Sequence, residues 1–106
     1  MTTTVYVESD QATRETMYLV QSAISKEVAT LKLAIRAGER RLAEFEKKYG
    51  VSSDYFIAEM AAEDMDEGDD EYIRWAGEFD LTQSLREKLQ RLMEINYRDQ
   101  RTSHSD

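Results

Sequence analysis

With 106 residues, of which 41% are hydrophobic, the chain has room for one domain at most, and a helical protein of this size buries little surface by itself. Its net charge of −8 argues against direct nucleic-acid binding, because contact with phosphates needs a positive surface. The absence of cysteine excludes disulfides and thiolate zinc sites. The sequence shows neither a secretory leader nor a run of about eighteen apolar residues, which predicts a cytoplasmic protein without a membrane segment.

The first expected elements are an arm and a long helix. Residues 1–9 form the arm, in which Thr3–Val7 alternates weakly and is compatible with a short strand. A helix is expected from about Asp10 or Thr13 to Tyr49, because this stretch is rich in strong helix formers and the chain lacks proline. Two lysines in its last turn mark its end, together with Gly50, which can adopt a left-handed cap.

Apolar residues recur along this helix in alternating steps of three and four, the spacing of a seam that packs against another helix. The members are Met17, Val20, Ile24, Val28, Leu31, Ile35, Gly38, Leu42, Phe45 and Tyr49. Because Gly38 has no side chain, it would let a crossing helix approach closely. The alternative is a tolerated glycine that costs about 1 kcal/mol relative to alanine.

A short corner helix and a second long helix follow. The corner helix, capped by Ser52, is expected over about Ser53–Glu63. A glycine and three carboxylates at residues 68–71 mark the start of the next helix, which is expected to run to about Arg98 unless it breaks near Gly77–Asp80. Its apolar residues return to the same spacing at Trp75, Phe79, Thr82, Leu85, Leu89 and Leu92. Residues 99–106 are polar and are expected to form a flexible tail.

Two long helices joined by a corner helix predict an all-α fold, in which residues 10–98 form an antiparallel helical hairpin. A single hairpin would leave one side of the apolar seam of each long helix uncovered. We therefore also predict a homodimer, in which two hairpins form a four-helix bundle. The seam of the hairpin or dimer is assigned to Val20, Ile24, Val28, Leu31, Ile35, Gly38, Leu42, Leu85, Leu89 and Leu92.

Charge and aromatic residues concentrate in the corner. The segment Asp54–Asp80 contains eleven acidic residues and one basic residue, a balance of −10. Seven of the ten aromatic residues lie in it or beside it, and aromatic anchors within an acidic rim are typical of a docking surface for a basic protein. The alternatives are a solvated acidic turn and a small aromatic core. We expect most of the corner aromatics to belong to the core and one or two, such as Tyr55 or Tyr72, to be exposed. The predicted partner-binding residues are Asp54, Tyr55, Glu59, Asp66, Asp69, Asp70, Glu71 and Tyr72.

Residues for catalysis or tight metal binding do not form a recognisable pattern. The single histidine, His104, lies in the predicted tail. An EF-hand built around Gly68 would need an oxygen ligand at position 65, which is Met65. We therefore predict no enzyme activity and no cofactor, and the carboxylates allow at most weak divalent-cation binding.

Two stretches, Leu42–Phe56 and Gly68–Phe79, resemble small helical proteins of bacteria and archaea that are often encoded beside toxin-like partners, as in toxin–antitoxin operons. The resemblance covers residues 42–79 and rests on the sequence Phe-Glu-Lys-Lys-Tyr-Gly, a capped helix with paired aromatics and an acidic turn. It implies an antitoxin-like or accessory role, in which the acidic aromatic corner occludes a basic nuclease surface. The chain lacks a visible helix-turn-helix or ribbon DNA-binding domain, which puts operator binding in doubt.

The leading hypothesis is a non-enzymatic interaction protein, a hairpin homodimer that binds a basic protein through Asp54–Phe79. One alternative is a purely structural coiled-coil or bundle scaffold, in which the acidic corner is only solvated. The other is a weak divalent-cation-binding module.

Overall fold

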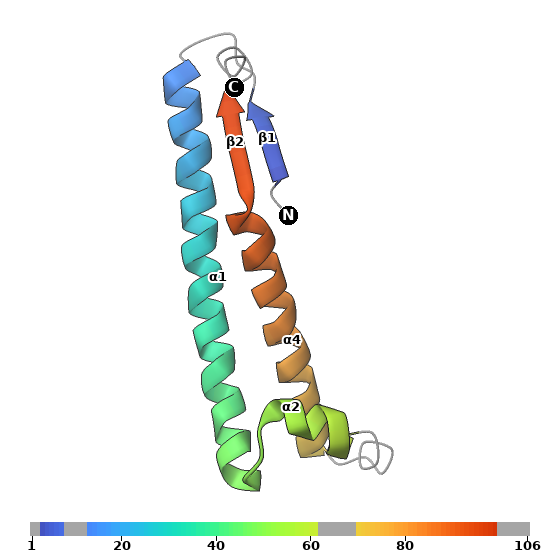
Figure 1. Cartoon of the computed structure of the whole chain (residues 1–106). Helices are drawn as coiled ribbons and strands as arrows, with labels where there is room; N and C mark the ends of the chain where they lie inside the picture. Colours follow the sequence, from blue (N-terminus) through green and yellow to red (C-terminus); the bar gives the residue numbers. More distant parts are fainter. Residues whose placement is uncertain (1–2, 8–12, 62–69, 100–106) are drawn as a thin grey trace. The chain divides into compact units, whose positions relative to one another are not determined.

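The computed structural model of the chain describes residues 3–7, 13–61 and 70–99 (Figure 1). In chain order its elements are strand β1 (Thr3–Val7), helix α1 (Thr13–Tyr49), helical turn α2 (Ser53–Tyr55), π-helical turn η1 (Phe56–Met60), helix α4 (Asp70–Met93) and strand β2 (Ile95–Asp99). The long helices α1 and α4 with the corner α2 and η1 confirm the predicted all-α helical hairpin. Dimerisation into a four-helix bundle stays a prediction.

The chain forms two compact units. The strand unit consists of Met1–Lys32 and Glu87–Asp106, and it contains β1, β2 and the adjoining parts of the two long helices. The corner unit consists of Leu33–Arg86 and contains α2 and η1 with the remaining parts of α1 and α4. No helix in the described ranges is both long enough and apolar enough to traverse a lipid bilayer.

The end of α1 and the start of α2 confirm the predicted helix signals. Gly50 has a φ of 72°, and its N–H donates to the Glu46 carbonyl at 2.8 Å. Ser52 is the N-cap of α2, since its hydroxyl accepts a hydrogen bond from the Tyr55 N–H at 3.1 Å. The Glu46 carboxylate accepts the Ser53 N–H at 2.8 Å, so α1 itself supplies a second cap for the corner.

The corner helix is confirmed as far as Ala61, and residues 62 and 63 lie outside the described residues. Its middle is a wider π-helical turn, in which the Ala61 N–H donates to the Phe56 carbonyl. This irregular turn was not predicted. Phe56 and Ala61 are both buried.

Helix α4 is continuous, and it ends earlier than the sequence predicted. It runs unbroken from Asp70 to Met93, which confirms a single helix across Gly77–Asp80 and rules out the alternative of a break there. It also ends five residues before the expected Arg98, because Ile95–Asp99 instead forms strand β2 and pairs in parallel with β1. That pairing satisfies backbone groups that a longer helix would have bonded internally. Asp99, assigned to the tail, ends β2, and the rest of the tail with His104 lies outside the described residues.

The predicted seam faces inward in both units. Every member of the α1 stripe from Met17 to Tyr49 is buried or half-buried, and so are Leu85, Leu89 and Leu92 on α4. In the corner unit, α1 and α4 approach closely at Gly38, where an added Cβ would lie 2.3 Å from the Thr82 hydroxyl oxygen. The close-approach interpretation of Gly38 is therefore confirmed, and the tolerated-glycine alternative is wrong.

Candidate protein-binding surface

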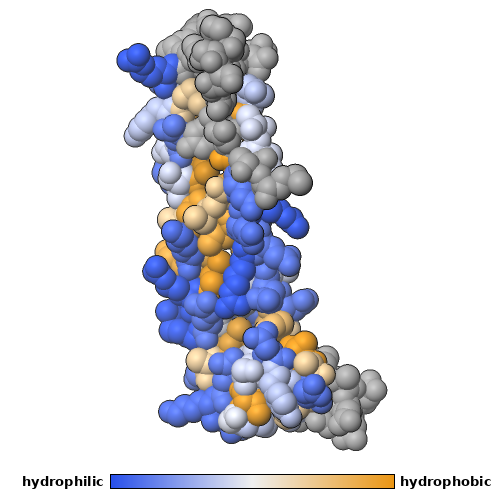
Figure 2. Space-filling model, viewed as in Figure 1, coloured by the Kyte–Doolittle hydropathy of each residue, from blue (hydrophilic) through white to orange (hydrophobic). Residues whose placement is uncertain are grey.

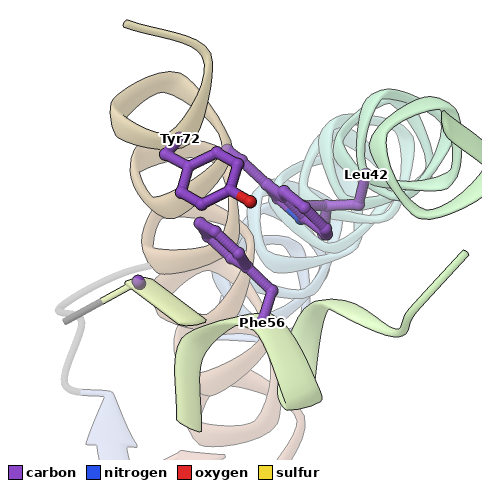
Figure 3. Close-up of a cluster of buried hydrophobic side chains, with 5 residues drawn as sticks. Leu42, Phe56 and Tyr72 are labelled. Carbon is purple, nitrogen blue, oxygen red and sulfur yellow. The ribbon is translucent and has the colours of Figure 1, made fainter. Parts of the chain in front are cut away.

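An aromatic core fixes the corner unit. Figure 3 shows Phe56 of η1 and Tyr72 of α4 converging with Leu42 of α1. The Phe56 and Trp75 rings stack at 3.9 Å between centroids and 2° between planes, and both side chains are fully buried. The Trp75 indole N–H donates to the Ser53 hydroxyl at 2.8 Å, so its one polar group is satisfied inside the core.

Most corner aromatics belong to this core rather than to a surface. Phe45, Tyr49 and Phe79 pack against it, as the core alternative predicted. Tyr72, a predicted partner-binding residue, is only 8% exposed, and its ring meets the rings of Tyr49 and Phe56 edge-on. The assignment of Tyr72 to the binding surface is therefore wrong. Tyr55 is 52% exposed, as expected.

Part of the acidity of the corner is neutralised by α1. Arg41 pairs with Glu78 at 2.7 Å, and the Lys48 ammonium lies 2.7 and 2.8 Å from the two oxygens of Glu71. Both pairs line an open groove of about 690 Å³, whose lining residues are Arg41, Glu44, Phe45, Lys48, Glu71, Arg74, Gly77 and Glu78. Three cations and three carboxylates balance in this groove. Glu71 is thus an internal ion-pair partner, and we withdraw its assignment to the partner-binding surface.

The Glu71 carboxylate has a shifted pKa. Hydrogen bonds from Lys48 and Tyr49, with smaller contributions from the charges of Lys48 and Arg74, lower this pKa below its ordinary value of 4.5, against a partial desolvation that raises it. A carboxylate with a lowered pKa stabilises the fold above pH 4.5, and this stabilisation is lost as the pH falls through the lowered pKa.

We therefore expect acid to weaken the corner below pH 4.5. Replacing Lys48 with methionine should raise the pKa of Glu71, and replacing Tyr49 with phenylalanine should raise it less, because each change removes one hydrogen bond to the ionised form. An NMR titration of the Glu71 side-chain carboxyl measures this directly. An unchanged midpoint in the Lys48→Met variant would contradict the assigned cause.

Four other carboxylates face solvent. Asp54, Glu59, Asp70 and Asp80 are exposed, and none forms an ion pair with another described residue. On α4, Asp70 and Asp80 lie on the same face as Ile73, since their spacing follows steps of three and four. Asp54 and Glu59 flank Ile57 in the corner.

An apolar groove of about 430 Å³ borders one of these carboxylates, Asp80. It is lined by Ile57 of η1 and by Ile73, Ala76, Gly77, Phe79 and Asp80 of α4. Ile73 is 45% exposed and lines this groove. Figure 2 shows apolar patches set among hydrophilic surface in the part of the molecule that holds the corner. Sequence analysis missed the groove, although the spacing of Asp70, Ile73 and Asp80 places an apolar residue on an acidic helix face.

We call Asp54, Tyr55, Glu59, Asp70, Ile73 and Asp80, together with the groove, the acidic face. Two predicted members of the partner-binding surface, Asp66 and Asp69, lie outside the described residues. Within the described ranges, no three His, Cys, Asp or Glu side chains gather closely enough to hold a metal ion. Most carboxylates of the predicted weak cation site lie outside those ranges, so that alternative stays a prediction. Comparisons of the chain with protein-family models, with curated proteins and with solved structures find no match.

Proposed function

We propose that this chain is a non-enzymatic interaction protein that binds a basic protein partner through the acidic face. One observation carries the proposal: solvent-facing carboxylates without an ion pair in the described part of the chain accompany an apolar groove with an exposed isoleucine. Glu71 and Glu78, by contrast, are paired with Lys48 and Arg41 of α1.

The chemistry of the acidic face defines the partner. An apolar side chain that enters the groove would bury Ile73, and lysine or arginine residues on either side would meet Asp70 and Asp80. By sequence, residues 33–86 contain fourteen acidic and seven basic residues, a balance of −7 that would speed encounter with a positive surface.

The resemblance over residues 42–79 gives this partner a class. Proteins of that kind are encoded beside toxin-like proteins, so an antitoxin-like or accessory role in the cytoplasm fits the proposal. In this role, the acidic face would occlude a basic surface of a toxin-like nuclease, and it would do so without a DNA-binding domain.

The test is a double charge reversal on the acidic face. The immobilised chain is used to capture proteins from a lysate of its native host, the partner is identified by mass spectrometry, and its affinity is measured by calorimetry with purified proteins. Asp70→Lys with Asp80→Lys should weaken binding at least about tenfold, and the wild-type affinity should fall with added salt. The matched control is Glu27→Lys with Glu87→Lys, the same charge change at two exposed positions of the strand unit.

Replacing an apolar residue of the groove separates the contribution of the groove to binding from that of the charges. Ile73→Ser should weaken binding, whereas Leu33→Ser, at a 63% exposed leucine of the same unit, should not. Equal affinities of wild type and the double lysine variant, or equal losses in the variant and its control, would refute the proposal.

A purely structural scaffold is the second candidate, and the burial of six corner aromatics in or against one core favours it. It predicts that no specific partner is captured. It also predicts that the double lysine variant behaves as wild type in every binding assay.

A further inference from the structure

The two strands form a small parallel ribbon with an open edge. Among the residues that the structure describes, β1 pairs with β2 alone, in a register that places Thr3 opposite Ile95 and Val7 opposite Asp99. Figure 1 shows β1 on the side of β2 away from α1. Parallel sheets are normally covered on both faces, and two strands alone are marginally stable in water. The ribbon therefore lacks strands that an ordinary sheet would have.

The free hydrogen-bonding groups of β1 can be assigned. The Thr3 N–H donates to the Glu94 carbonyl at 3.0 Å, so Thr3 directs its backbone groups toward β2. Because successive residues of a strand direct these groups to alternate sides, Val5 also faces β2, whereas Thr4 and Tyr6 direct theirs to the outer edge. Within residues 3–7, 13–61 and 70–99, the outward backbone groups of Thr4 and Tyr6 have no strand partner, so they are available to a further strand.

The sequence of β1 lacks the usual protection of such an edge. Natural edge strands carry lysine, proline or a bulge, but Thr-Thr-Val-Tyr-Val has no charged residue and no proline. All five residues are β-branched or aromatic and favour strand pairing. Four of the five are exposed, including Tyr6 at 55%.

The strand unit is thinly packed and nearly neutral. Among the residues of this unit whose burial is described, only Leu31 is buried, and the other members of its α1 seam are half-buried. By sequence it contains eight acidic and seven basic residues, a balance of −1, so two copies would not repel one another there as two corner units would. An uncharged edge on a nearly neutral unit fits a second copy of this chain better than it fits a charged partner.

We propose that β1 pairs antiparallel with β1 of a second copy, across a two-fold axis at Val5, to form a four-stranded sheet. This register pairs all five residues of each strand. Thr4 then faces Tyr6 of the second copy, and the two residues exchange both backbone hydrogen bonds through the groups that face the outer edge. The two Val5 residues meet as a non-hydrogen-bonded pair, in which side chains lie closest. The residues of this interface belong to the strand unit, and those of the acidic face belong to the corner unit.

Introducing opposite charges at Val5 in two separate variants tests the register. Sedimentation equilibrium at about 1 to 100 μM should give a dimer for the wild type. Val5→Lys and Val5→Glu should each raise the dissociation constant of the dimer at least about tenfold, because like charges would face each other across the two-fold axis. An equimolar mixture of these two variants should recover the dimer. Thr4→Pro should also dissociate it, since proline removes an N–H from the outer edge and leaves the groups facing β2 in place.

The control is Ala29→Lys, which adds a charge at an exposed position of α1 in the same unit and should leave the dimer intact. A monomeric wild type would overturn the proposal. So would a dimer that survives both Val5 variants, or a Lys and Glu mixture that fails to reassociate.

Discussion

Replacing Trp75 with alanine is expected to lower the free energy of unfolding by about 3 to 5 kcal/mol, the usual cost of deleting a large buried aromatic side chain. Trp75 is fully buried, stacks on Phe56 at 3.9 Å and donates its indole N–H to Ser53, so the change leaves a cavity and an unpaired hydroxyl. Urea unfolding followed by circular dichroism measures the loss, because the variant no longer contains the single tryptophan of the chain.

The matched control is Tyr55→Ala. Tyr55 is an aromatic residue of the same corner that is 52% exposed, and its replacement should change the stability by no more than about 0.5 kcal/mol. A Trp75→Ala variant as stable as this control would show that the aromatic core does not hold the corner.

Replacing Gly38 with alanine is expected to destabilise the protein by about 1 to 3 kcal/mol, although alanine is the better helix former by about 1 kcal/mol. The new Cβ would lie 2.3 Å from the buried hydroxyl oxygen of Thr82, so the Thr82 side chain or the helices would have to shift. In a Thr82→Ala background the nearest remaining atom of residue 82 is its Cβ at 3.4 Å. The double variant should therefore lose less stability than the two single variants combined.

Gly77→Ala is the control, because Gly77 lies within α4 and an added Cβ there has no atom within 4 Å. This substitution should stabilise the protein by about 0.4 to 1 kcal/mol. If Gly38→Ala were also stabilising in urea unfolding, close approach of the helices at residue 38 would be wrong.

The long helices were predictable because their signals are local. Regular spacing specifies which face of α1 turns inward, and Gly50 and Ser52 supply caps within a few residues of the groups they satisfy. The burial of Tyr72 was also within reach, since it precedes Trp75 by three residues and therefore shares its helix face. The concentration of charge around Tyr72 led instead to the prediction that it belongs to the binding surface.

The features that were missed depend on contacts between distant parts of the chain. Strand β2 replaces the last turn of the expected helix because it pairs with β1, about 90 residues earlier in sequence, and no local pattern encodes that choice. The apolar groove is lined by Ile57 of η1 and Ile73 of α4, so predicting it would have required knowing how these two elements pack together. The internal pairing of Glu71 likewise depends on Lys48, a residue from the opposite helix.

The π-helical turn η1 shows that the corner holds one residue more than regular winding would require. Phe56 and Ala61 are five residues apart, a separation that regular α-helical winding would rotate to different faces. The wider turn, closed by the hydrogen bond from the Ala61 N–H to the Phe56 carbonyl, accommodates one additional residue and keeps both side chains in the core. Loss of a single residue between Phe56 and Ala61 would therefore leave the two core residues four apart, the spacing at which regular α-helical winding keeps both on one face.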